Sequence, residues 1–384
     1  MATNGEAKPA VLIIGGLDRA RELIGYLGRF LALHIHENKL ASEVRLVDKV
    51  LPQLAWLAPE FDEACSRDKF VQADATREQS LYRVFDRENG AQFDYVFNCG
   101  GENRYSQPED VYRLRNHALS LTIGREAAKR GVRAFIECST ATVYKGDREP
   151  RKEGDRTKPW FKLAKWKLAA EEDLQKIEGL NLCILRFPRV YGEYESGYFA
   201  TGICLAKIYK HLGKELAWLY SKDMKVNTVH VKDATRAMWT AAEWRASKGQ
   251  IAENDGTPTL FNIVDHNDTT QGHLAEIISK NFDLEFTFVG SVASQFAKLN
   301  LDNLLDDMNE EILQPWADML AEKGITRQGP ISPFIERELL KDSDLSIDGK
   351  LFETTTGFQY QIPHIDAEAI KTMINSYERM GWWP

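Results

Sequence analysis

The sequence has 384 residues and a formal net charge of −8, so it can bury a large core, and its length favours two lobes. The acidic balance and the lack of a basic patch argue against a protein that binds nucleic acid or an anionic membrane. No apolar run approaches the roughly 20 residues that cross a bilayer, and the start MATNGEAKPA lacks a signal-peptide layout. The five cysteines show no CxxC pair and no metal-ligand spacing, so we expect a cytoplasmic protein without a metal site or a disulfide framework.

The first predicted unit covers residues 11–34 and consists of an apolar run, a glycine pair and an amphipathic helix. The continuous run VLII predicts a parallel strand that is buried on both faces. Glycines after such a strand let a phosphate approach the N-terminus of the following helix, which indicates dinucleotide binding. The glycines expected to take part are Gly15, Gly16, Gly25 and Gly28. Their spacing is longer than in the usual three-glycine fingerprint.

The longer spacing comes from the seven residues DRARELI at 18–24, which allow two interpretations. In the first, they bulge out and residues 25–28 still close the phosphate turn. In the second, the helix begins early and Asp18 caps it. The Asp18 carboxylate would then point at the place of a pyrophosphate and repel it. Whether a cofactor binds depends on which interpretation holds.

The next strands end in residues that suit the rest of a dinucleotide. EVRLVDK ends near Asp48, whose carboxylate can accept hydrogen bonds from the ribose hydroxyls and so favours NAD over NADP, a preference that Lys49 weakens. KFVQAD places Asp74 at the adenine end. FDYVFNCGG ends in Gly100 and Gly101, which leave room for the dinucleotide backbone.

Helices and strands then continue to alternate. A helix is predicted over 108–131, a strand over 132–144, a second helix over 160–178 and a strand from 181. This order predicts an α/β fold with a doubly wound parallel sheet that binds ligands at the carboxyl ends of its strands. We predict a dinucleotide-binding domain over 8–190 and 226–265, and a substrate-binding lobe over 191–225 and 266–384.

Six segments resemble the extended short-chain dehydrogenase/reductase superfamily, of the NAD-dependent epimerase/dehydratase type. In order they are IIGG…GYLGRFL, STATVY, KLAAEE, LRFPRVYG, NTVHVKDATRA and FNIVDHNDTT. The resemblance implies a Rossmann-type sheet with a smaller, mostly helical C-terminal substrate lobe. It also implies NAD or NADP as cofactor, a small-molecule substrate and a homodimer formed through the helices at 108–131 and 160–178.

The resemblance also implies a set of catalytic residues, and one of them is missing. In the family, a Ser or Thr at a strand end works with a Tyr that lies four residues before a helical Lys and exchanges a proton with the substrate. Here Thr140 matches the hydroxyl, and Lys167 or Lys165 matches the lysine. The Tyr position then falls on Leu163 or Phe161, neither of which can transfer a proton. The chain is thus an atypical member, with an interrupted glycine motif and no tyrosine at this position.

Another group must then supply the proton. Tyr144 is nearest along the sequence and is either catalytic or, as is usual in this family, a packing residue. Further candidates are Glu102, Tyr105, Tyr191 and His230. Pro188 is expected beside the cofactor. It also stands where relatives that act on nucleotide sugars tend to carry Asn, and 225–227 stand where they carry Arg, which argues against a nucleotide-sugar substrate.

The sequence supports three hypotheses about function. The first is an NAD(P)-dependent oxidoreductase, similar to epimerases and dehydratases, that acts on an apolar carbonyl or alcohol of specialised metabolism. The helical, aromatic-containing segment 292–345 suits such a ligand, although it could also cover the core or form a dimer face. The second is a non-redox lyase, isomerase or cyclase that uses the same pocket. The third is a catalytically silent NAD(P)-binding or regulatory protein.

Overall fold

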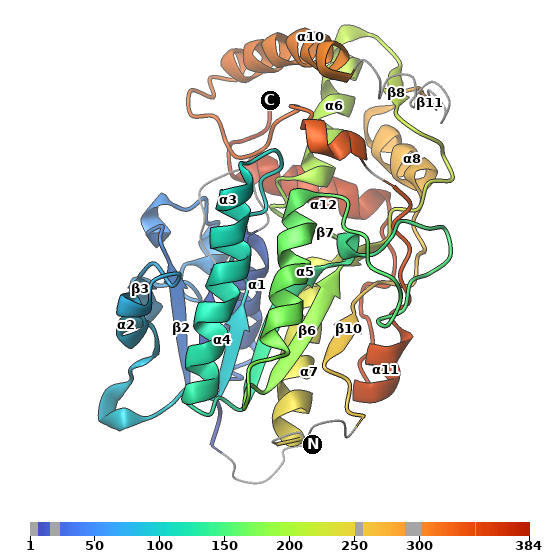
Figure 1. Ribbon diagram of the computed structural model, residues 1–384. Coiled ribbons are helices and arrows are strands. Elements are labelled where there is room, and N and C mark those ends of the chain that lie inside the picture. Colours follow the sequence, from blue (N-terminus) through green and yellow to red (C-terminus); the bar gives the residue numbers. More distant parts are fainter. Residues whose placement is uncertain (1–6, 16–23, 250–255, 289–300, 342) are drawn as a thin grey trace.

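The computed structural model describes residues 7–15, 24–249, 256–288, 301–341 and 343–384. At its centre is a sheet of seven parallel strands in the order β10-β6-β5-β4-β1-β2-β3 (Figure 1). The strands are β1 (Ala10–Ile14), β2 (Glu43–Asp48), β3 (Phe70–Gln72), β4 (Tyr95–Asn98), β5 (Ala134–Thr140), β6 (Leu182–Phe187) and β10 (Leu260–Asn262). The chain builds the sheet outward from β1 in one direction and then, from β4, in the other. This confirms the predicted doubly wound Rossmann-type α/β fold.

Helices cover both faces of the sheet. They are α1 (Ile24–Glu37) and α7 (Val231–Ser247) on one face, and α2 (Leu81–Phe85), α4 (Leu119–Lys129) and α5 (Lys162–Leu174) on the other (Figure 1). Val11 and Ile13 join the core under α1 and α7, while Leu12 and Ile14 join the core under α2 and α4. Successive side chains of a strand point to opposite faces, so a strand between two helical layers must be apolar throughout.

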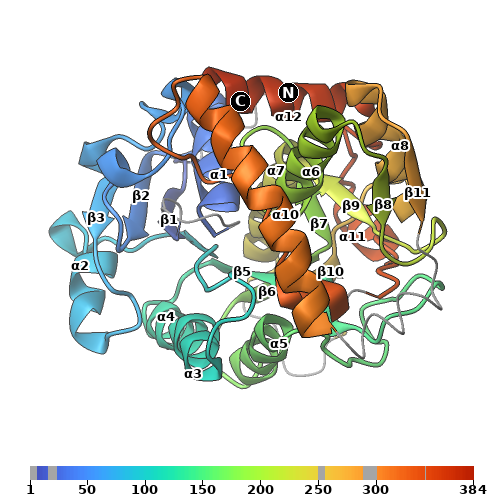
Figure 2. The same cartoon turned by 90° about the horizontal axis from the view of Figure 1, so that it is seen from above.

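A smaller, mostly helical part lies at the carboxyl ends of the strands. Its helices include α6 (Tyr198–Leu212), α8 (Gln271–Phe282), α10 (Leu301–Glu322) and α12 (Ala367–Arg379), with the short parallel pairs β7 (Arg189–Tyr191) with β9 (Thr228–His230) and β8 (Leu216–Trp218) with β11 (Phe286–Phe288). Seen from above, α10 crosses over the middle of the molecule (Figure 2). The helix α11 (Lys350–Thr356) packs against β10 and α7 instead, so part of the chain after residue 266 also covers the sheet.

Two further segments shape the site. Between β4 and α4 the chain forms a loop, the short helix α3 (Glu109–Tyr112) and a π-helical turn over Arg113–Ala118. After β5, the side chain of Thr140 accepts a hydrogen bond from the Thr142 amide and so starts a short 3-10 turn. Both segments therefore present side chains at the carboxyl end of the sheet.

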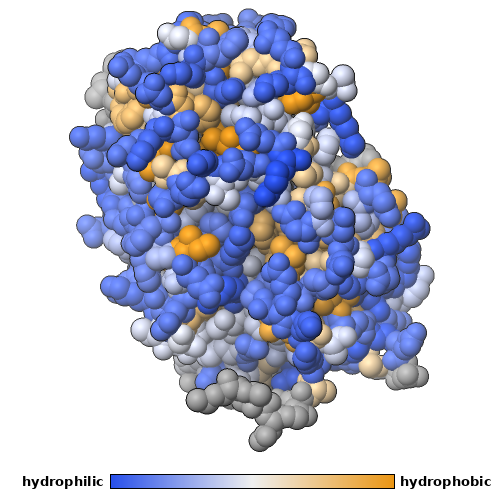
Figure 3. Space-filling model, turned by 180° about the vertical axis from the view of Figure 1, so that it is seen from behind, coloured by the Kyte–Doolittle hydropathy of each residue, from blue (hydrophilic) through white to orange (hydrophobic). Residues whose placement is uncertain are grey.

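The surface seen from behind is largely hydrophilic, and apolar side chains gather there in small, scattered groups (Figure 3). None of the described helices has the length and apolar character that a membrane span requires. Among the described residues there is also no cluster of His, Cys, Asp and Glu that could hold a metal ion.

Candidate functional site

The ends of β1 and β4 approach each other more closely than side chains would allow. Gly15 has a φ of +75°, and a Cβ atom on it would lie 2.5 Å from the Cα of Gly100. Only glycine fits such a place, because the backbone is left-handed and the neighbouring atom belongs to the backbone that follows β4. The two glycines leave an open space beside the sheet, of the kind that a dinucleotide backbone needs.

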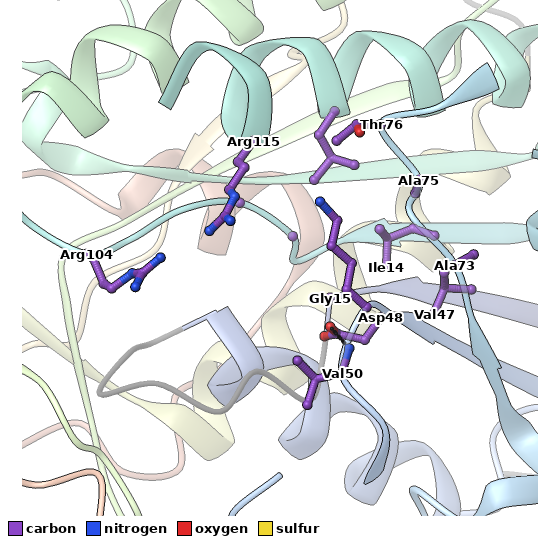
Figure 4. Close-up of a pocket in the computed structure, with 14 residues that line it drawn as sticks. Ile14, Gly15, Val47, Asp48, Val50, Ala73, Ala75, Thr76, Arg104 and Arg115 are labelled. Atoms are coloured by element: carbon purple, nitrogen blue, oxygen red, sulfur yellow. Dashed lines mark hydrogen bonds between the residues drawn. The ribbon is translucent and has the colours of Figure 1, made fainter. Parts of the chain in front are cut away.

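This space is a cavity of about 300 Å³, which we call the Asp48 cavity (Figure 4). Gly15, Asp48 and Gly100, all predicted cofactor residues, line it together with Ala75 and Thr76. Asp48 closes β2, and one oxygen of its carboxylate accepts a hydrogen bond from the Val50 amide at 3.1 Å. The fold therefore brings three of the predicted cofactor residues together at the Asp48 cavity.

The remaining glycines of the motif are not all in this cavity. Gly25 and Gly28 are buried within α1, which is helical from Ile24 onward in the part that the structure describes. Gly16 and residues 18–23 lie outside the described residues.

Asp74 follows β3 but contacts neighbouring side chains. Its Oδ1 accepts hydrogen bonds from the amide and hydroxyl of Thr76, and Lys49 Nζ lies 3.2 Å away. Partial burial raises the pKa of Asp74, but the hydrogen bonds from Thr76 and Lys49 outweigh this effect, and the net pKa is lowered. Asp74 is thus an anion that shapes the loop beside the cavity and holds the cation of Lys49.

A second cavity of about 110 Å³, the Thr140 cavity, lies at the ends of β5 and β6. Thr140, Lys167 and Pro188 line it, as does Leu163 at the position where the family carries Tyr. The Thr140 hydroxyl lies 2.9 Å from that of Thr142. Two of the four residues predicted as catalytic, Thr140 and Lys167, therefore lie at one cavity, and the wall at position 163 is apolar.

The two candidate lysines differ in position. Lys167 is buried, and its Nζ donates hydrogen bonds to the carbonyl oxygens of Cys138 at 2.8 Å and Gly100 at 3.3 Å. Lys165 lies on another side of the same helix and pairs with Glu109, and its side chain is 60 % exposed. A step of two residues turns a helix by about 200°, so both cannot face one cavity. Of the two, Lys167 lines the Thr140 cavity.

Tyr144 does not line the Thr140 cavity. Its side chain is buried, its hydroxyl donates to Asn262 Oδ1 at 2.8 Å, and the Arg186 guanidinium lies 4.7 Å from its ring centre. Burial raises the pKa of Tyr144 to about 12, against the opposing effect of Arg186. The sequence allowed two interpretations of Tyr144, a catalytic residue or a packing residue. These contacts favour the packing residue.

Two of the further candidates, His230 and Tyr191, are buried side chains. His230 Nδ1 accepts a hydrogen bond from the Lys232 amide at the start of α7, and burial lowers the pKa of His230 to about 4. Tyr191 is fully buried, and burial raises its pKa. Neither residue lines one of the cavities described here.

Tyr105 does line the Thr140 cavity, together with a residue that the sequence interpretation missed. Arg189 Nη1 donates a hydrogen bond to the Tyr105 hydroxyl at 2.7 Å, and its guanidinium lies 4.4 Å from the ring centre of Tyr198. The Tyr105 ring meets Phe161 edge to face at 5.3 Å. The cavity thus contains a phenol beside a permanent positive charge. The signal in the sequence was an Arg directly after the proline at a strand end.

Glu195 is a second residue of this cavity that was missed. Its side chain is 1 % exposed, and its carboxylate accepts hydrogen bonds from the amides of Gly197 at 2.6 Å and Ala200 at 2.9 Å. Burial raises the pKa of Glu195 to about 7, although the amide hydrogen bonds and Arg189 act in the opposite direction. Glu195 can therefore change its charge near neutral pH.

A third cavity of about 130 Å³, the Trp218 cavity, lies in the smaller lobe between α6, β8, α8 and α10. Its wall is mainly apolar and includes Leu205, Trp218, Leu274 and Met308. Tyr198 lines both this cavity and the Thr140 cavity, so the two are neighbours. An apolar space next to a polar one suits a ligand with an apolar part and a single reacting polar group.

Comparisons with known proteins agree with this architecture. Among solved structures, ADP-L-glycero-D-manno-heptose-6-epimerase of Helicobacter pylori superposes with a TM-score of 0.63 at 15 % identity, covering 97 % of this chain and 96 % of that one. WbmG of Bordetella bronchiseptica, in complex with NAD and UDP, gives 0.63 at 15 %, covering 98 % and 97 %. UDP-N-acetylglucosamine 4-epimerase of Methanobrevibacter ruminantium M1, in complex with UDP-N-acetylmuramic acid, gives 0.62 at 15 %, covering 97 % and 99 %. Identities this low show a shared fold.

The sequence itself gives the family. The comparison with curated proteins found no match. Residues 24–257 match the family model described as NAD dependent epimerase/dehydratase family, which is more than half of the chain. Together with the parallel sheet and the glycines at the ends of β1 and β4, this match shows that the chain belongs to the NAD-dependent epimerase/dehydratase family.

Proposed function

We propose that the protein binds NAD or NADP in the Asp48 cavity and transfers hydride to or from an apolar carbonyl or alcohol in the Thr140 cavity. The observation that supports this most directly is Lys167. It lines the Thr140 cavity, and its Nζ donates to the carbonyl oxygen of Gly100, which lines the Asp48 cavity. One cation at the border of both cavities suits a ligand that extends from one into the other, and a ribose hydroxyl is a group that it could bind there.

The residues of the Asp48 cavity fit such a cofactor. The close approach of Gly15 and Gly100 leaves room for its backbone, and the Asp48 carboxylate can accept hydrogen bonds from the adenosine ribose, which favours NAD. When bound, the reduced cofactor would supply the hydride for the carbonyl carbon of the substrate.

The chain itself must supply the proton for the carbonyl oxygen. Leu163 cannot do this. Two tyrosines line the Thr140 cavity, Tyr105 and Tyr198, and the hydroxyl of Tyr105 accepts a hydrogen bond from Arg189. Arg189 donates this bond through Nη1, so the positive charge lies beside the phenol oxygen. In carbonyl reduction Tyr105 would donate its hydroxyl proton to the substrate oxygen, and the charge of Arg189 would stabilise the phenolate that remains. Thr140 would hold the same oxygen by a hydrogen bond.

The Trp218 cavity supports the choice of an apolar substrate. Its aromatic and aliphatic wall would take up the apolar part of the ligand while the carbonyl lies in the Thr140 cavity. Near this lobe, Lys225 Nζ pairs with Asp268, and Asn227 donates a hydrogen bond to the same carboxylate. These polar groups are therefore engaged within the protein, in the place where relatives that act on nucleotide sugars tend to carry Arg.

Leu163 favours one alternative. With an apolar residue in place of the family Tyr, the same cavity could catalyse a lyase, isomerase or cyclisation reaction without a redox change, by orienting its ligand in a closed space. Such a reaction would proceed without consuming NAD(P)H.

A titration with NADH and NADPH, followed by energy transfer from tryptophan and by thermal shift, tests cofactor binding. Ligand at a hundredfold excess over Kd should stabilise the fold by about 2.7 kcal/mol. A panel of aryl and alkyl ketones and alcohols then tests for a change in nicotinamide absorbance. Binding with turnover supports the redox proposal, and product without loss of NAD(P)H supports the alternative. If neither cofactor binds, the proposal is wrong.

A further inference from the structure

A cluster of three charged side chains stands at the edge of the Asp48 cavity. Glu102 is 1 % exposed, and its carboxylate accepts hydrogen bonds from Arg104 Nε and Nη2, both at 3.0 Å, and from Arg115 Nη1. The neighbouring Asn116 side chain hydrogen-bonds both the amide and the carbonyl of Glu102. The loop after β4 and the π-helical turn before α4 are thus fixed to each other through one buried carboxylate.

Both arginines of the cluster remain partly exposed. Two guanidinium groups surround one carboxylate, and each arginine side chain is 40 % exposed although its carboxylate partner is buried. Arg115 donates to Glu102 through a single nitrogen, while a guanidinium has five N–H donors in total. Because Glu102 fixes their positions, the two arginines form a rigid cationic site rather than a mobile one.

The cations face the cavity on one side. Arg104 and Arg115 both line the Asp48 cavity, next to Gly100 and Gly101, which have no side chains. Figure 4 shows the two guanidinium groups reaching into the open space from the same side, with Ala75 and Thr76 on the opposite side. The arginines therefore lie across the cavity from Ala75 and Thr76.

We propose that Arg104 and Arg115 bind the diphosphate of the cofactor, which rests on the proposed function of this cavity. Guanidinium groups bind phosphate oxygens through paired, charge-assisted hydrogen bonds. In dinucleotide-binding folds the phosphates usually lie against a glycine turn and a helix N-terminus. In this sequence seven additional residues separate the glycines of that turn. The arginine pair takes over part of the charge neutralisation from the opposite wall of the cavity.

The test compares the affinities of NADH, NADPH and ADP-ribose for the full chain and for Arg104→Gln and Arg115→Gln, by calorimetry. Each substitution should weaken all three ligands by roughly 10- to 100-fold, the range expected when a hydrogen bond to a charged group is lost. The ratio between NADH and NADPH should not change, because both carry the same diphosphate. Arg115→Lys keeps the positive charge but not the paired N–H donors of the guanidinium group, so it should give an intermediate Kd.

Two matched variants serve as controls. Arg113→Gln removes the same charge two residues away, at an exposed position outside the cavity, and should leave all three affinities unchanged. Lys49→Gln lies at the Asp48 end of the cavity and should change the ratio of NADPH to NADH affinity instead. Thermal unfolding of each variant shows whether it is folded.

The outcomes separate the two levels of the proposal. If the full chain binds NADH and the folded arginine variants bind it equally well, the diphosphate site is wrong while cofactor binding stands. If the arginine variants lose affinity for NADPH alone, the pair binds the 2′-phosphate and the diphosphate assignment is overturned. If the full chain binds none of the three ligands, both the proposed function and this site are wrong.

Discussion

The Asp48 cavity and the Thr140 cavity lie at the same edge of one sheet, yet they are built differently. The wall of the first is formed largely by strand ends and by small residues such as Gly15, Gly100 and Ala75. The second contains Tyr105, which comes from the loop after β4, and Arg189, which is the first residue of the short strand β7 outside the central sheet. A cavity formed by the backbone persists when the sequence changes, whereas a cavity formed by side chains from outside the central sheet can acquire a new chemistry on the same sheet.

The largest effect is expected from a substitution that fills the Asp48 cavity at Gly15. In Gly15→Ala the new Cβ would lie 2.5 Å from the Gly100 backbone, at a φ of +75°. Because neither strand end can move without disturbing the sheet, we expect the free energy of unfolding to fall by about 2–4 kcal/mol. Binding of NADH, followed by tryptophan energy transfer, should be lost.

Gly131→Ala is the matched control, since its φ is +66° and nothing lies within 4 Å of a Cβ there. It should cost only the left-handed backbone penalty of about 1–2 kcal/mol and leave NADH binding intact. If both variants lost the same free energy of unfolding and the same NADH affinity, the close approach of β1 and β4 would not be what opens the cavity.

The second prediction tests the roles of Tyr105 and Arg189 in the Thr140 cavity. With an apolar ketone found in the panel, Tyr105→Phe should lower kcat by about 10²–10⁴-fold, because a general acid is removed. Arg189→Met should lower kcat as well, and both variants should bind NADH with unchanged Kd, which calorimetry can measure. A fall in NADH affinity with unchanged kcat would instead place Tyr105 in cofactor binding.

The first cavity was largely predictable from sequence. Continuous apolar runs mark strands buried on both faces, and residues directly after such strands lie at one edge of the sheet. Gly15, Asp48 and Gly100 were predicted in this way, and they line the Asp48 cavity. Thr140 and Lys167 line the other cavity and were predicted from the resemblance to the family. Each of these positions depends on local sequence and on the order of the elements.

The arginines were not predictable in the same way. Arg189 meets Tyr105 across 84 residues of sequence, and the pattern of the central strands does not determine which side chains outside the sheet meet. In the sequence, nothing distinguishes Arg104 and Arg115 from ordinary surface charges. The structure shows that the buried carboxylate of Glu102 holds them together. Contacts of this kind depend on loop conformation, which has no periodic signal in the sequence.

The third prediction concerns pH and Glu195. Burial raises its pKa in the folded protein to about 7, above the ordinary value of 4.5, so between these pH values the folded state holds a proton that the unfolded state has lost. Stability from this group is therefore complete below about pH 4.5 and decreases as pH rises toward 7. In Glu195→Gln that decrease should be smaller by about 1–3 kcal/mol.

Urea unfolding of both proteins at pH 5, 6, 7 and 8 measures the difference. Asp265, whose pKa burial also raises to about 7, titrates in the same range in both proteins and cancels in the comparison. Parallel pH curves would show that Glu195 is ionised throughout and that its carboxylate has a stronger partner than the amides at the start of α6.

The smallest expected effect separates the two tyrosines that could replace the missing family residue. Tyr144→Phe removes the hydrogen bond to Asn262, whose side chain also donates to the carbonyl oxygens of Arg151 and Asp348. We expect a loss of about 1 kcal/mol in the free energy of unfolding, typical of a single buried hydrogen bond, with kcat unchanged. If Tyr144→Phe instead abolished turnover while Tyr105→Phe did not, the proton would have to come through the wall between Tyr144 and the Thr140 cavity. The comparison would then reverse, because catalysis would depend on Tyr144, in the turn after β5, and not on the pair of Tyr105 and Arg189.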